Sequence, residues 1–262
     1  MANAIQQSSV QSLFLTMKFN DTEIATGTGF VVNSKIGSLL LTNRHNFTGK
    51  NNETSELLSK TGAIPNKITI CHNKKNELGK WIIKEENILD EDRPLWFEHP
   101  TLKEKADFIA LKLTNLSDVE IYAYDLISTG PQIACQVTDL VSVVGFPFGL
   151  QYGGSLGIWA TGFIASEMDI NFSERPVFLI DCRSRQGQSG SPVIAHRNGG
   201  MVPMQDGGSS VFTGAITKFL GIYSGRINNE SDLGLVWKAS ALSELIISIE
   251  NVNPPNHSNS SA

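Results

Sequence analysis

Short apolar segments rich in β-branched and aromatic residues recur along most of the chain, and each is bounded by turn-forming residues. Their lengths are typical of β-strands, and their regular spacing favours a sandwich or a barrel. Clear examples are GTGFVV (27–32), SLLLTN (38–43), DFIALKL (107–113), DLVSVVGF (139–146), PVFLIDC (176–182) and LGLVWKA (233–239). A further stretch, KITICHNKKNELGKWIIKE (67–85), has two apolar runs around a polar loop. The sequence therefore predicts an all-β fold with a hairpin at 67–85.

Helical periodicity is confined to one stretch near the C-terminus. In SALSELIISIENV (240–252), Leu242, Leu245, Ile246 and Ile249 stand at positions i, i+3, i+4 and i+7. This spacing lines up one face of a helix. We therefore expect a single amphipathic helix to follow the last strand.

A chain of 262 residues can form one large β-domain or two smaller ones that share an interface. The least strand-like stretch near the middle is 116–132. We expect an N-terminal β-domain over 1–115, a linker over 116–132 and a C-terminal β-domain with the helix over 133–252. The polar segment 253–262 is expected to be a disordered tail.

Charge and cysteine content argue against several classes of protein. The net charge is −5 and the lysines and arginines are scattered, whereas nucleic-acid binders carry a basic face. The three cysteines, Cys71, Cys135 and Cys182, lack the spacing of a disulfide framework or a zinc site. No apolar run approaches the ~18 residues that span a bilayer, and residues 1–14 do not resemble a signal peptide. We expect a cytoplasmic protein without a nucleic-acid or membrane partner.

Residues 186–193, QGQSGSPV, contain a serine that is a candidate nucleophile. Ser189 stands between Gly187 and Gly190 in a tight, small-residue segment. Such clusters also form ordinary turns. A serine becomes a nucleophile when a histidine accepts its proton and a carboxylate orients that histidine. The choice between nucleophile and turn therefore depends on partners elsewhere in the chain.

His45 and Asp107 are the candidate partners. His45 comes directly after a strand pair, GTGFVVNSKIGSLLLTN, where a side chain is exposed and rigidly held. Asp107 begins the apolar strand DFIALKL, and a partly buried carboxylate needs a partner. A loop histidine and a turn aspartate are the plainer alternatives. The remaining histidines are expected at the surface: His72, His99, His196 and His257.

Taken together and in this order, the three stretches resemble the trypsin-like (chymotrypsin-fold) serine peptidases, most of all the HtrA/Deg type of bacterial protease domain. GTGFVV…LLLTNRHN, ADFIALKL and GQSGSPV resemble the segments that carry the family's histidine, aspartate and serine. VVGFPFG (143–149) and WATGFIASE (159–167) also resemble its second barrel. The resemblance extends from about Gly27 to the helix near residue 250.

This resemblance implies two six-stranded antiparallel β-barrels, a C-terminal helix and a catalytic triad in the cleft between the barrels. Asp107 would orient His45, His45 would activate Ser189, and the N–H groups of Gly187 and Ser189 would form the oxyanion hole. The implied activity is hydrolysis of protein or peptide substrates through an acyl-enzyme. No metal or cofactor is implied.

The sequence departs from the digestive members of the family. They carry Asp immediately before the serine, where it pairs with a newly cleaved N-terminus, whereas this chain has Gln188. Activation by that kind of cleavage is therefore not expected.

Two residues are candidates for contacts near the substrate. Counting back from Ser189 without gaps puts Arg183 at the specificity position, where it would favour an acidic substrate side chain; the alternative is that Arg183 faces solvent. Ser224 would help to seat Asp107.

Three alternative functions use part of the same sequence pattern. An α/β-hydrolase esterase uses the order Ser, acid, His and a G-x-S-x-G elbow, but GQSGS lacks the last glycine and strands do not alternate with helices. A non-catalytic binding module of the same fold is a second alternative. A third is a peptidase that stays latent until a separate regulatory protein orders its oxyanion loop.

Overall fold

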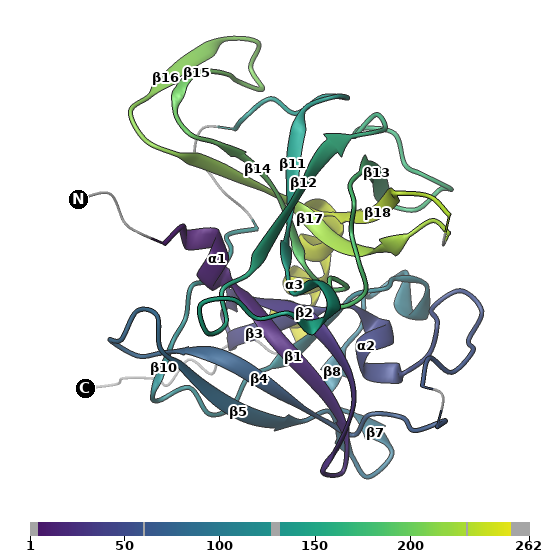
Figure 1. The fold of residues 1–262 in the computed structure, drawn as a ribbon. Coiled ribbons are helices and arrows are strands. Elements are labelled where there is room, and N and C mark those ends of the chain that lie inside the picture. Colours follow the sequence, from purple (N-terminus) through teal and green to yellow (C-terminus); the bar gives the residue numbers. More distant parts are fainter. Residues whose placement is uncertain (1–4, 60, 127–131, 229, 253–262) are drawn as a thin grey trace, which may run out of the picture.

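The computed structural model describes residues 5–59, 61–126, 132–228 and 230–252 (Figure 1). The predicted all-β fold with a C-terminal helix is confirmed. The predicted tail at 253–262 and residues 127–131 of the predicted linker lie outside the described residues. Within the described ranges, no helix combines the length and the apolarity needed to cross a membrane.

The N-terminal half forms one antiparallel sheet of eight strands in the order β10-β4-β1-β2-β3-β9-β8, with β5 paired to β4. Its strands are β1 (Ser12–Phe19), β2 (Thr22–Ser34), β3 (Gly37–Thr42), β4 (Lys67–Lys74), β5 (Trp81–Asn87), β8 (Trp96–Phe97), β9 (Ile109–Lys112) and β10 (Val119–Glu120). The short strands β6 (Leu89–Asp90) and β7 (Arg93–Pro94) pair with each other.

This half differs from the expected six-stranded barrel. Two of its eight strands, β8 and β10, are two residues long, too short for alternation to reveal them. β10 extends the sheet beyond β4 from within the stretch expected to be a linker. The predicted hairpin at 67–85 is confirmed as β4 and β5.

The C-terminal half is a closed six-stranded antiparallel barrel in the order β11-β12-β13-β18-β17-β14. Its strands are β11 (Leu140–Gly145), β12 (Ile158–Ile164), β13 (Val177–Asp181), β14 (Pro192–Arg197), β17 (Ile216–Arg226) and β18 (Leu233–Lys238). A hairpin of β15 (Gly200–Pro203) and β16 (Ser209–Phe212) projects from it at the top of Figure 1. This half therefore has the predicted barrel form.

The described residues form one long helix and several short helical turns. They are α1 (Gln7–Gln11), α2 (Arg44–Thr48), α3 (Ala239–Val252) and the 3₁₀ turns η1 (Lys103–Lys105) and η2 (Pro147–Gly149). The predicted apolar face of α3 is buried, and it packs with Phe30, Phe108 and Trp237 in a core cluster that includes residues of both halves. This cluster fixes one half against the other, so a cleft between them is held rigidly.

Candidate active site

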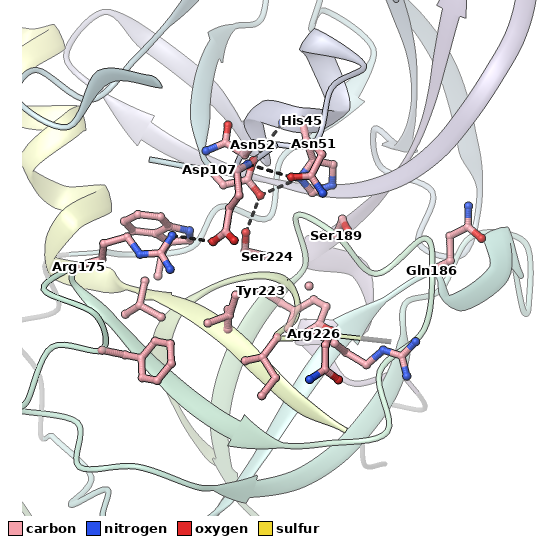
Figure 2. Close-up of a pocket in the computed structure, with 18 of the residues that line it drawn as sticks. His45, Asn51, Asn52, Asp107, Arg175, Gln186, Ser189, Tyr223, Ser224 and Arg226 are labelled. Carbon is pink, nitrogen blue, oxygen red and sulfur yellow. Dashed lines mark hydrogen bonds and ion pairs between the residues drawn. The ribbon is translucent and has the colours of Figure 1, made fainter. Parts of the chain in front are cut away.

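A cleft of about 840 Å³ is lined by both halves of the molecule (Figure 2). His45 and Asp107 come from the N-terminal half, and Ser189 and Ser224 from the C-terminal half. The structure therefore brings the three residues predicted to form a triad into one cleft, together with Ser224.

His45 lies on α2, a single helical turn directly after β3, rather than in the loop that its position suggested. The turn ends at Gly49, whose φ of 64° lies in the left-handed region that glycine adopts at little cost. Before the helix, the buried side chain of Asn43 donates from Nδ2 to the backbone carbonyl of Asp107 at 2.6 Å. These contacts hold the start of α2 against the segment that carries Asp107.

Asp107 is 6% exposed, and donors surround its carboxylate. Oδ1 accepts the backbone N–H of His45 at 3.0 Å, and Oδ2 lies 2.7 Å from His45 Nδ1. The Ser224 hydroxyl donates to the same Oδ2 at 2.5 Å. A buried carboxylate is stable when it is hydrogen-bonded in this way. The contact with Nδ1 fixes the ring, so that Nε2 is the nitrogen left for other chemistry.

Two opposing effects act on the pKa of His45. Burial alone would lower the pKa of the imidazole, because it penalises the charged form. The charge of Asp107 and its hydrogen bond to the ring act in the other direction, and together they outweigh burial. The pKa of His45 therefore lies above its ordinary value of 6.5.

Ser189 lies in a turn that glycines make possible. Gly187 and Gly190 have φ values of 92° and 87°. A Cβ at Gly190 would lie 2.1 Å from the carbonyl oxygen of Thr28. The carbonyl of Ser189 accepts the backbone N–H of Thr28 at 3.0 Å, which ties the turn to the N-terminal half. Among the described residues, the Ser189 hydroxyl and His45 share no hydrogen bond; such contacts often tighten only with substrate.

The peptide between Gln186 and Gly187 has a fixed orientation. The Gln186 carbonyl accepts the backbone N–H of Phe148 at 2.6 Å, and the Gly187 carbonyl accepts the Thr28 hydroxyl at 2.9 Å. The N–H and C=O of a trans peptide point in opposite directions. The N–H of Gly187 therefore points away from Phe148. A Cβ at Gly187 would lie 2.4 Å from the carbonyl oxygen of Phe146, so this position requires glycine.

The structure places the predicted specificity residue Arg183 outside the cleft. Cys182 and Ser184 are buried, while Arg183 between them is exposed and is not part of the cleft lining. Counting back from Ser189 took no account of the alternation of buried and exposed side chains in the residues after β13. The arginines that do line the cleft are Arg175, Arg185 and Arg226. Arg226 ends the stretch GIYSGR (221–226) in β17.

The expectation that the other histidines lie at the surface was wrong for two of them. His72 and His99 are each 1% exposed. His72 falls within β4 rather than in the hairpin loop, and the ring of His99 packs edge-on against Phe108, 5.8 Å between centroids. His196 is partly exposed, and His257 lies outside the described residues.

Comparison with known proteins identifies related sequences and folds. The family model described as a trypsin-like peptidase domain matches residues 27–204. No curated protein matches this chain significantly. An inactive form of Rv3671c from M. tuberculosis H37Rv is 16% identical, with a TM-score of 0.52, over 94% of this chain and 90% of that one.

Two further solved structures are similar over nearly the whole chain. The serine endoprotease from Yersinia pestis is 14% identical, with a TM-score of 0.54, over 94% of this chain and 66% of that one. The HtrA-type protease AlgW, solved with a tripeptide, is 14% identical, with a TM-score of 0.55, over 95% of this chain and 62% of that one. At these identities the likeness is one of fold.

Proposed function

We propose that this chain, which belongs to the trypsin-like peptidase family, is a serine endopeptidase that works through a triad of Ser189, His45 and Asp107. The observation that carries this proposal is the set of hydrogen bonds around the Asp107 carboxylate. It accepts the N–H of His45, lies 2.7 Å from His45 Nδ1 and accepts the hydroxyl of Ser224, in the cleft that Ser189 also lines. A carboxylate used in this way orients an imidazole as a general base.

The proposed reaction has two halves. Ser189 Oγ forms a bond to the substrate carbonyl carbon while His45 Nε2 takes its proton, and His45 then gives that proton to the leaving amine as the C–N bond breaks. The result is an acyl-enzyme. Water attacks the acyl carbon, His45 takes the water's proton, and the proton returns to Ser189 Oγ as the acid leaves. Asp107 stabilises the imidazolium in both halves.

The N–H groups of Gly187 and Ser189 are the proposed oxyanion hole. Each tetrahedral intermediate carries a negative oxygen that hydrogen-bond donors must stabilise. The bond from Phe148 N–H to the Gln186 carbonyl supports this role, because it orients the Gly187 N–H away from Phe148.

Activation by a newly cleaved N-terminus is not part of the proposed mechanism. Gln188, which stands directly before the serine, is fully buried, and its Oε1 accepts the backbone N–H of Arg185 at 2.8 Å. The side-chain amide of Gln188 thus binds Arg185, which lies in the same loop four positions before Ser189. A neutral side chain held in this way offers no charge to pair with an incoming ammonium group.

The experiment that tests this proposal is hydrolysis of an unfolded protein substrate between pH 5 and pH 9. A general base must be neutral, and the pKa of His45 lies above 6.5. We expect kcat/KM to rise with pH through an apparent pKa above 6.5 and then to level off. Absence of hydrolysis across this range, or activity that is highest below pH 6, would contradict the proposal.

Ser224 is proposed as a positioning residue for Asp107. Replacing Ser224 by Ala removes one hydrogen bond to a carboxylate, a loss of about 1.5–3 kcal/mol, so we expect kcat/KM to fall about 10- to 100-fold. The freed Oδ2 would hold the protonated imidazole more strongly, so the acid limb of the pH profile should move to higher pH. Ser224→Thr keeps the hydroxyl and should recover most of the activity. Unchanged turnover and an unchanged pH profile in Ser224→Ala would contradict the role.

A further inference from the structure

Three arginines line the cleft, and two of them have close partners. Arg175 Nη1 lies 2.9 Å from Glu53 Oε1, and its guanidinium stands 6.0 Å above the ring of Trp237. Arg185 Nη1 donates to the carbonyl of Ser184 at 2.8 Å. Each of these two guanidinium groups therefore donates a hydrogen bond within the protein.

Arg226 is different. It forms an ion pair with Asp232, with Nη1 and Oδ1 4.0 Å apart, and the same Oδ1 lies 3.5 Å from Arg185 Nη1. Two guanidinium groups therefore share one carboxylate. Within the part of the chain that the structure describes, no acceptor forms a hydrogen bond with the Arg226 guanidinium, and its side chain is 31% exposed. A guanidinium has five N–H donors, and one that lines a cleft with its donors unused favours an anionic ligand.

Arg226 lines the cleft that holds the proposed triad. The pairing of β17 with β18 is irregular between Tyr223 and Gly225, so Ser224 lies at a bulge, and Gly225 has a φ of 127°. A bulge changes the direction of side chains next to it. Ser224 reaches Asp107, and Arg226 belongs to the lining of the same cleft, together with Tyr223 and Ser189 (Figure 2).

We propose that Arg226 makes this peptidase selective for an acidic residue directly before the scissile bond. Its guanidinium would bind the side-chain carboxylate of that residue through paired N–H···O bonds, the geometry in which arginine recognises carboxylates best. Asp232 is already shared between two cations, so a second carboxylate balances the charge. A lysine or arginine at the same substrate position meets an unneutralised cation and is disfavoured. This inference rests on the proposed function and adds the substrate class.

The test uses fluorogenic peptides that differ only in the residue before the cleaved bond, which is Glu, Gln or Lys. Glu and Gln have the same shape, so their ratio of kcat/KM isolates the charge. The variant is Arg226→Gln, and the matched control is Arg183→Gln, which removes an exposed arginine outside the cleft lining. A fluorophosphonate probe counts the reactive serine in each sample independently of the peptide.

We expect the wild type to prefer Glu over Gln by about 10- to 100-fold, the scale of hydrogen bonds to a charged group. Arg226→Gln should bring the ratio close to one, mainly through a higher KM for the Glu peptide, and Arg183→Gln should leave it unchanged. Preference for Gln or Lys in the wild type, or an unchanged ratio in Arg226→Gln, would overturn the inference. If the probe still labelled Ser189 in that case, the proposed function would stand. Loss of both labelling and hydrolysis in the wild type would overturn the two together.

Discussion

Replacing Asp107 by Asn is expected to lower kcat by about 10⁴-fold without changing the fold, the scale on which a triad depends on its carboxylate. Asn has the same shape, and its carbonyl oxygen can still accept the backbone N–H of His45 that Oδ1 accepts at 3.0 Å. Its NH₂ group then takes the place of Oδ2, opposite His45 Nδ1. Two donors cannot face each other, so Nδ1 must become the acceptor and Nε2 must carry the proton.

In that tautomer the imidazole presents an N–H to Ser189 and cannot remove its proton. The matched control is Asp181→Asn, which changes an exposed carboxylate on β13 and should keep wild-type kcat. Steady-state kinetics with any cleaved peptide measures both variants, and circular dichroism compares their folds. An Asp107→Asn protein that keeps more than about a tenth of wild-type kcat would mean that this carboxylate is not the one that orients the base.

The larger features of the fold could be predicted because they follow from local sequence patterns. Two apolar runs around a polar loop identified the hairpin of β4 and β5, and the i, i+3, i+4, i+7 spacing identified the buried face of α3. Strand β1 was missed even though Leu13, Leu15 and Met17 alternate along it and are buried. The hairpin β15–β16 was missed for another reason: the glycines at 199–200 and 207–208 favour a loop interpretation, and pairing between the two strands decides the conformation.

The main residues of the candidate site could be predicted because they lie in sequence motifs that follow one another in the expected order. Contacts between distant segments could not be predicted in the same way. The bonds from Asn43 to the Asp107 carbonyl and from Thr28 to the turn of Ser189 join residues 64 and more than 150 positions apart. The sequence leaves Arg183 open between the specificity position and the solvent, and its exposed side chain outside the cleft lining fits the second alternative. Which side chains enter the cleft depends on the local fold and not on distance along the chain.

Covalent labelling with a fluorophosphonate probe tests most directly whether Ser189 is an activated nucleophile. Phosphonylation requires a serine whose proton is removed by a base, so labelling reports the triad without a known substrate. We expect the wild type to react at a single site that peptide mapping identifies as Ser189. Ser189→Ala should not react at all, and His45→Ala should react slower by several orders of magnitude, about 10⁴-fold or more.

Ser191→Ala provides the control, because it removes a buried hydroxyl two residues from the nucleophile and should label like the wild type. Labelling at Ser189 that needs His45 would establish Ser189 as a nucleophile activated by His45. A folded wild-type protein that takes up no label would contradict it. The chain would then be a binding module that retains the triad residues, or a latent enzyme that needs a separate protein to order the loop around Gly187.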